Sequence, residues 1–252
     1  MLSEPFSTGN SVIHRIDPRH RILAAFLYSV VVAVLNQLPA LVLATVFSGL
    51  LVKTAGLDGR AVFRRLALVN GFVALFWLIL PFTAKGDILF EAGPFTVYEA
   101  GVLLALQITL KSNAIIMAFI SLVSTMSFST LGYALRSLKL PHKLVFLFIL
   151  TYRYIFVIEQ EYRKIWRSVK VRGFSPATSL HCYKTYAYMI GMIFVRASAR
   201  ADRVYRAMLC RGFNGRFHSL AEFPASSVNG LFLFLAILCT VLIVSTEWYF
   251  HG

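Results

Sequence analysis

Charged residues are scarce in this chain, and four long stretches contain none. Asp, Glu, Lys and Arg make up 14% of the 252 residues, whereas an ordinary soluble domain carries about 25%. The uncharged stretches are residues 22–52, 66–84, 112–135 and 223–246. A helix of about 20 apolar residues crosses a hydrocarbon core of roughly 30 Å. Several uncharged runs of this length argue against a soluble protein with buried helices and predict transmembrane helices.

The sequence also lacks the short motifs that commonly carry nucleotide binding or catalysis. It has no GxxxxGK[ST] phosphate loop, no GxSxG and no HExxH, and its six histidines form no HxxxH or HxH group. The three cysteines, Cys182, Cys210 and Cys239, are too far apart for a CxxC pair. Paired carboxylates that would line an ion path are missing from the predicted spans. We therefore expect no catalytic residue, metal site or cofactor in this chain, and no self-sufficient pump.

The positive charge is concentrated in one segment. The formal net charge is +14, and residues 136–216 hold 16 Lys and Arg against 3 Asp and Glu. Cytoplasmic loops of membrane proteins carry an excess of Lys and Arg, so this segment, the basic loop 53–65 and the N-terminus are expected inside. The acidic loop 85–99 is then expected outside. Five spans satisfy this bias, with the N-terminus inside; they are predicted at about 22–36, 39–53, 66–84, within 100–131, and 226–247.

Two regions leave the number of spans open. Residues 22–52 are too long for one ordinary span, and a polar break at 36–39, ending in Pro39, favours a turn within them. Lys111 interrupts residues 100–131, so the helix there is expected to be long, tilted or kinked. If this region crossed the membrane twice, the basic segment would face outward, which the charge bias disfavours.

These observations predict an all-α integral membrane protein with about five transmembrane helices and a cytoplasmic set of amphipathic coupling helices. Residues 1–131 are expected to hold about four spans, residues 132–216 the cytoplasmic helices, and residues 217–252 a last membrane helix. Apolar runs within the basic segment, such as 144–150, are too short to span and indicate amphipathic or buried helices at the inner face of the membrane.

A plain structural interpretation covers the residues before the first span. Asp17 is expected to cap a helix whose first position is Pro18. Arg19 and Arg21 would then anchor this helix at lipid phosphates.

Two stretches of the basic segment repeat one pattern. Residues 162–174 and 201–213 align at an offset of 39 residues, and both end in Arg-Gly-Phe. Each copy carries an apolar stripe at positions i, i+3, i+4 and i+7, which predicts an amphipathic helix. Arg196, Arg200 and Arg203 add a basic stripe upstream of the second end. The identical positions pair Arg167 with Arg206, Arg172 with Arg211, Gly173 with Gly212, and Phe174 with Phe213.

A single Arg-Gly helix end has an ordinary explanation. Glycine just past a helix adopts the left-handed conformation that ends it, and a cation in the last turn complements the helix dipole. The duplication indicates more, namely two docking points for two copies of one partner surface. Arginine suits docking because its planar fork holds a carboxylate through two hydrogen bonds. Binding of lipid headgroups by these arginines is the alternative.

The chain resembles the transmembrane coupling subunit, or T component, of energy-coupling factor (ECF) transporters over almost its whole length. The resemblance rests on Asp17-Pro18-Arg19 and the two terminal Arg-Gly elements, together with two stretches, Leu138-Lys139-Leu140-Pro141-His142-Lys143 and Leu150-Thr151-Tyr152-Arg153-Tyr154. The family's paired signature is Ala-Arg-Gly, and here Val171 and Cys210 replace the alanines. Within the family, Leu80-Pro81-Phe82, Gly86 and Tyr98-Glu99-Ala100-Gly101 look like the cobalt-type (CbiQ) branch; a nickel-type or vitamin-type subunit is the alternative.

The resemblance implies a mechanism and a set of partners. Two cytoplasmic ATPase subunits would bind and hydrolyse ATP, and a separate membrane subunit (S component), of the cobalt type, would bind the substrate. This chain would couple them in the bacterial cytoplasmic membrane as a non-catalytic, multi-pass subunit that contacts the lipid bilayer and no nucleic acid. The resemblance assigns contact with the ATPases to Arg172, Gly173, Arg211 and Gly212, with Arg167 and Arg206 beside them.

Two other functional classes compete with this interpretation. A membrane-embedded enzyme acting on lipid headgroups could use the basic segment as a cradle for an anionic substrate, but it needs a nucleophile or metal cluster that the sequence does not display. A nucleic-acid binder at the membrane surface would retain DNA in a salt-sensitive way.

Overall fold

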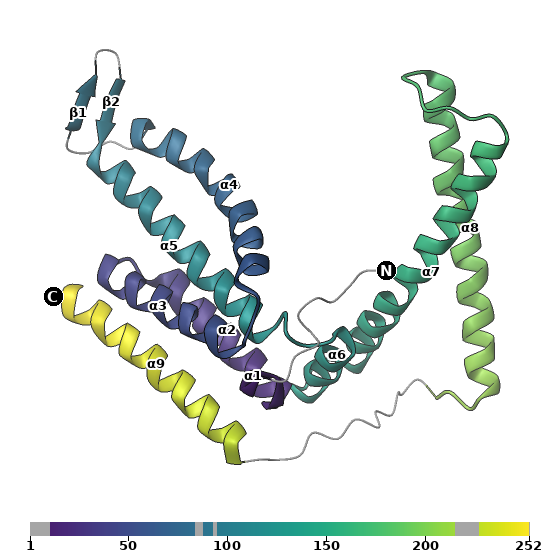
Figure 1. Ribbon diagram of the computed structural model, residues 1–252. Helices are drawn as coiled ribbons and strands as arrows, with labels where there is room; N and C mark the ends of the chain where they lie inside the picture. The colour runs from purple at the N-terminus through teal and green to yellow at the C-terminus, as the bar shows by residue number, and fades with distance from the viewer. Residues whose placement is uncertain (1–10, 84–87, 93–94, 215–226, 252) are drawn as a thin grey trace. The chain divides into compact units, whose positions relative to one another are not determined.

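The computed structural model describes residues 11–83, 88–92, 95–214 and 227–251, and the regular secondary structure there is helical except for one hairpin (Figure 1). The hairpin pairs β1 with β2 antiparallel, within the loop predicted to be acidic. The all-α membrane class is confirmed, and the hairpin is an addition that the sequence analysis did not predict. The elements are α1 (Val12–Arg15), α2 (Pro18–Val34), α3 (Leu38–Thr54), α4 (Gly59–Thr83), β1 (Ile88–Ala92), β2 (Phe95–Tyr98), α5 (Glu99–Leu122), α6 (Phe128–Ser137), α7 (His142–Val171), α8 (Leu180–Cys210) and α9 (Ser227–His251).

The chain divides into two compact units. In the described part, residues 11–134 and 227–251 form the first, which we call the membrane-helix unit, and residues 135–214 form the second, which we call the helix pair. The membrane-helix unit contains α1 to α5, the hairpin and α9. The helix pair consists mainly of α7 and α8.

Apolar helices of two lengths make up the membrane-helix unit. By length and composition, α4, α5 and residues 229–249 of α9 are long and apolar enough to cross a membrane, with 25, 24 and 21 residues. Helices α2 and α3 have 17 residues each, about 25 Å of helix. The turn between them falls at the predicted polar break at 36–39. The fourth predicted span ends at Leu122, earlier than the limit of 131, and α6 begins a separate helix.

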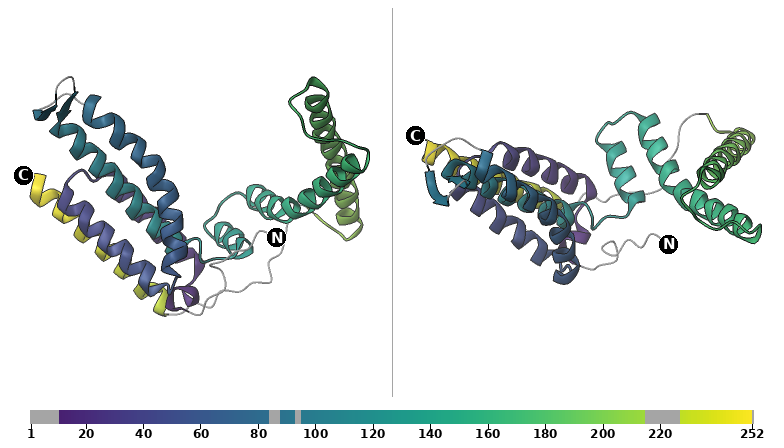
Figure 2. Two further views of the ribbon diagram at one scale, coloured as in Figure 1. Left: turned by 45° about the horizontal axis from the view of Figure 1, so that its top comes forward. Right: turned by 90° about the horizontal axis from the view of Figure 1, so that it is seen from above.

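Helix α5 is the centre of the membrane-helix unit. It packs against α2, α3 and α4, while α9 lies along α2 and α3 (Figure 2). Four alanines of the core are fully buried, and small residues of this kind let membrane helices approach closely. They are Ala40, Ala44, Ala114 and Ala118. The packing of α5 on α4 is closer still at Gly101, where an added Cβ would lie 2.8 Å from the Cα of Pro81. The contact joins two of the segments on which the cobalt-type resemblance rests.

Two charged residues complete the turn between α2 and α3. Lys111 Nζ donates to the carbonyl of Ala33 and to the side chain of Asn36, at 3.2 Å each. The carboxylate of Glu247 accepts from the backbone N–H groups of Asn36 at 2.8 Å and Gln37 at 3.0 Å. A cation thus faces the C-terminus of one helix and an anion the N-terminus of the next, as helix dipoles favour. Lys111 does not interrupt α5, which is continuous through it.

The prediction for the start of α2 is partly wrong. Asp17 accepts from the backbone N–H of Arg19 at 2.9 Å and Pro18 opens the helix, as expected. Arg21, however, is 2% exposed rather than set among lipid phosphates. Its Nε donates to the carbonyl of Leu122 at 3.1 Å, and its Nη2 to the hydroxyl of Thr125. A buried guanidinium needs such acceptors, so Arg21 ties α2 to the C-terminal end of α5.

Candidate functional site

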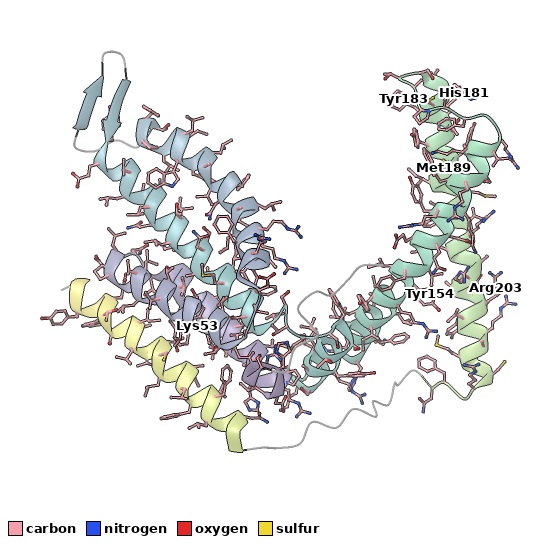
Figure 3. The ribbon with its side chains drawn as sticks, viewed as in Figure 1. Lys53, Tyr154, His181, Tyr183, Met189 and Arg203 are labelled. Atoms are coloured by element: carbon pink, nitrogen blue, oxygen red, sulfur yellow. The ribbon has the colours of Figure 1, made fainter. Side chains whose placement is uncertain are left out.

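The candidate site is carried by α7 and α8, two helices of 30 and 31 residues. Three cross-contacts define their arrangement: Trp166 with Tyr186, Glu161 with Arg200, and Phe146 with Phe213. Residue numbers rise along α8 as they fall along α7, so the helices are antiparallel. Figure 3 shows His181 and Tyr183 at the loop end of α8 and Arg203 nearer its other end.

The antiparallel arrangement separates the two Arg-Gly elements. Arg172 follows the end of α7, beside the start of α8, and lines the same cavity as His181. Arg211 follows the far end of α8. The contact between Glu161 and Arg200 lies 11 residues before each of them, so with a rise of 1.5 Å per residue they are roughly 35 Å apart along the pair. The repeat therefore places two similar helix ends at opposite extremities of one unit.

The first helix end is a Schellman cap. Gly173 has φ +82°, its N–H donates to the carbonyl of Lys170 at 3.0 Å, and the N–H of Phe174 reaches back to Val169 at 3.3 Å. These are the two hydrogen bonds that define the motif, and a left-handed glycine is what permits them. Arg172 stands at the C-cap, immediately before the reversal.

The second helix end repeats the first bond for bond. Gly212 has φ +77°, its N–H donates to Leu209 at 3.0 Å, and the N–H of Phe213 donates to Met208 at 3.0 Å. Arg211 again occupies the C-cap. The capping interpretation of both glycines is thereby explained in atomic terms, since two of the carbonyls that each helix end would leave open accept hydrogen bonds from the N–H groups of the glycine and the phenylalanine.

All six predicted site residues are exposed. Within the described part of the chain, the side chains of the four arginines make no hydrogen bond or ion pair. Their guanidinium donors therefore face outward, while the backbone beneath them is held by the cap. No observation tests their role in binding a partner, which stays a prediction. The four are Arg167, Arg172, Arg206 and Arg211.

Aromatic residues fill the space beside the first helix end. Trp166 stacks on Tyr186 of α8 with ring centroids 6.1 Å apart. Phe174, the residue after Gly173, meets both rings edge-on, at 6.2 and 5.6 Å. The predicted apolar stripe of the first copy thus packs against α8, and Ile165 within it is buried.

The stripe of the second copy behaves differently. Val204, Tyr205 and Met208 line an apolar cavity of about 480 Å³, whose opposite wall includes Leu147 and Tyr154 of α7. Phe213 lies beside Phe146 of α7, with ring centroids 5.9 Å apart. A second cavity, of about 470 Å³, lies beside Arg172 and is lined by polar as well as apolar side chains.

One carboxylate joins the two helices between these cavities. Glu161 Oε1 lies 3.7 Å from both Arg196 and Arg200 of α8, and Oε2 lies 3.7 Å from Lys164. Two members of the basic stripe predicted on α8 therefore face α7 instead of forming a row on an outer surface. The sequence analysis missed Glu161, although the presence of only three acids in a strongly basic segment was a signal that could have identified it.

The described residues contain no group of three or more His, Cys, Asp or Glu that could hold a metal ion.

Comparison with known proteins places the chain beside membrane transport subunits. Residues 9–222 match the family model of the cobalt transport protein CbiQ. The energy-coupling factor transporter transmembrane protein EcfT of Bacillus subtilis is 27% identical over 232 residues, 85% of each chain. The EcfT proteins of Leuconostoc gelidum and Listeria monocytogenes are similar at 28% and 29% identity, over 82% and 83% of each chain.

Proposed function

The chain belongs to the CbiQ cobalt transport protein family and is a transmembrane (T) component of an ECF transporter, and we propose that it couples two ATPase subunits to a separate substrate-binding subunit. The observation that carries this proposal is the pair of matching capped helix ends, Arg172-Gly173 and Arg211-Gly212, at opposite extremities of one helix pair. Two docking points of one design suit two copies, or two close relatives, of one partner.

The chemistry of the helix ends indicates what the partner offers. Each Schellman cap forms through backbone N–H groups, so the side chains of Arg172 and Arg211 take no part in it. An exposed guanidinium that has no partner within the described chain binds a carboxylate best, through two parallel hydrogen bonds. We infer an acidic pocket on each ATPase, with Arg167 and Arg206 contributing charge one to two turns upstream.

We infer the direction of coupling from the position of the two arginines at the helix ends. Movement of the ATPases during ATP binding and hydrolysis displaces both helix ends, and the helix pair passes the displacement to the substrate-binding subunit. The ATPases carry the nucleotide and the catalysis, and this chain contributes neither. The basic helix pair lies on the cytoplasmic side with the N-terminus, as the excess of Lys and Arg favours.

Cobalt is the proposed substrate of the complex. The family model is described as a cobalt transport protein, and the α4–α5 contact at Gly101 joins residues of the cobalt-type resemblance. Uptake of radiolabelled Co²⁺, Ni²⁺ and biotin by cells expressing the chain with its partner subunits measures the choice. Uptake of Ni²⁺ or biotin without Co²⁺ would overturn the assignment to cobalt and leave the coupling role intact.

The docking role is tested by charge reversal at the two ends. We expect Arg172→Glu or Arg211→Glu alone to weaken binding of one ATPase, and the two changes together to abolish co-purification of both and substrate uptake. Arg203→Glu is the control for position, because Arg203 is an exposed arginine of α8 about two turns before the capped end. Normal assembly and uptake in the double variant would reject the proposal.

A further inference from the structure

The 39-residue repeat extends further than its sequence identities, because the two copies face each other with approximate twofold symmetry. If residue i of α7 contacts residue j+39 of α8, such symmetry requires residue j to lie near residue i+39. Trp166 contacts Tyr186, and the equivalent pair, Leu147 and Tyr205, lines one cavity. Arg196 meets Glu161, and the equivalent pair, Val157 and Arg200, lines the same cavity.

Glu161 lies where this approximate axis passes between the helices. Position 161 corresponds to position 200 at the offset of 39, and Glu161 is paired with Arg200 itself at 3.7 Å. Only a position on the axis can contact its own equivalent. Glu161 is 11 residues before Arg172, and Arg200 is 11 residues before Arg211, so the pair lies midway between the two capped ends.

Opposite charges at this position reduce the electrostatic repulsion between the two basic helices. The segment 136–216 holds 16 Lys and Arg against 3 Asp and Glu, so its two helices repel each other. A symmetric repeat would place like residues on the axis. The chain instead has an acid in one copy and a base in the other, so an attractive pair stands where two like charges would repel each other.

The environment of Glu161 makes the contact more than a surface ion pair. Its side chain is 16% exposed and faces three cations, Lys164, Arg196 and Arg200. Of the other acids in the segment, Glu159 pairs with Arg163 of its own helix at 2.6 Å and is 36% exposed. Exposed pairs within one helix contribute little, whereas Glu161 joins two helices.

We propose that Glu161 is a positioning residue that fixes the crossing of α7 and α8, so that displacement of the Arg172 end is passed on to the Arg211 end. The proposal rests on the coupling function proposed above. Without this ionic contact, the two ends would respond to their ATPases separately. ATP hydrolysis would continue, while the substrate moved per ATP would fall.

The test compares Glu161→Gln with Glu159→Gln in the full complex in liposomes, measuring ATP hydrolysis, substrate uptake and ATPase co-purification. We expect both variants to retain the ATPases. The uptake per ATP hydrolysed should fall by about fivefold or more in Glu161→Gln, the usual scale of a coupling interaction, and stay unchanged in Glu159→Gln. Equal ratios in the two variants would overturn the inference.

Exchange of the charges provides a rescue that a general structural defect does not allow. Glu161→Arg alone should lose coupling, or assembly if the repulsion is severe. Glu161→Arg combined with Arg200→Glu keeps one acid and three bases at the contact and should restore much of the lost ratio. No recovery in the exchanged variant would contradict the role of the pair. Failure of the coupling function itself is read separately, from the charge reversals at Arg172 and Arg211.

A distance measurement reports the crossing directly. Cys210 is exposed and corresponds to Val171 at the same offset, so spin labels at Cys210 and Val171→Cys probe both helix ends once Cys182 and Cys239 are replaced by alanine. In full-length chain in lipid nanodiscs, we expect Glu161→Gln to broaden the distance distribution and Glu159→Gln to leave it narrow. The same narrow distribution in both would contradict the proposal.

Discussion

The helix pair has two arms, which are the parts of α7 and α8 around Arg172 and around Arg211. The two arms have the same helix cap and different packing. In the Arg172 arm, the rings of Trp166, Tyr186 and Phe174 pack against one another. Around Arg211, the equivalent positions hold Tyr205 and Leu147, which line an open apolar cavity instead of stacking. The difference shows that the helix caps and the packing between the helices are under separate requirements. The caps are alike because they present arginine in the same way, whereas the arms between them are free to diverge.

The largest expected loss of stability comes from disrupting the aromatic packing of the Arg172 arm. Trp166→Ala removes a half-buried ring that joins α7 to α8, and we expect a loss of about 2 kcal/mol, below the range for a fully buried tryptophan. Tyr205→Ala is the matched change, and Tyr205 is 55% exposed, so its loss should stay under about 0.5 kcal/mol. Unfolding of each purified variant in detergent, followed by circular dichroism, measures the difference. Equal losses would show that the arms are packed alike.

Replacing the cap glycines should cause a smaller loss of stability, and the loss should be the same in both arms. Gly173→Ala and Gly212→Ala each force a side chain into the left-handed region, which costs about 1 kcal/mol. A Cβ at either position would meet open space, so no clash adds to this cost. The same unfolding assay checks it, with the asparagine variants as milder controls. A clear difference between the two alanine variants would mean that the caps are not equivalent.

The smallest effect concerns the positions before the arginines. Val171 is 87% exposed, and Cys210 is exposed as well. Val171→Ala and Cys210→Ala should each change the stability of the isolated chain by no more than a few tenths of a kcal/mol, through helix propensity alone. A loss of ATPase co-purification in either variant, with stability unchanged, would locate the partner's contact at that residue.

Local signals in the sequence predicted the helix caps well. Glycine after an arginine, twice at the same offset, was enough to place the ends of α7 and α8 within one residue. The turn between α2 and α3 was equally local, because the polar residues before Pro39 interrupt a long apolar run. Such features depend on neighbouring residues, whose order the sequence states directly.

Features that depend on distant residues were missed or misjudged. Arg21 was expected at lipid phosphates because nothing near it in sequence reveals the acceptors at Leu122 and Thr125. Glu161 became significant only when the antiparallel arrangement set it against Arg200. The offset that relates these two residues was visible in the sequence, but the fact that they touch required the fold.

The charged caps of the α2–α3 turn carry a consequence for biogenesis. The ribosome makes the α2–α3 hairpin before either charged residue, since Lys111 follows the turn by some seventy residues and Glu247 by some two hundred. During insertion, the N–H groups of Asn36 and Gln37 must rely on water or on lipid headgroups until α9 arrives. Completion of the α2–α3 turn is therefore postponed until α9 is made, and a chain that stops short of Glu247 retains an unfinished turn for quality-control proteases to recognise.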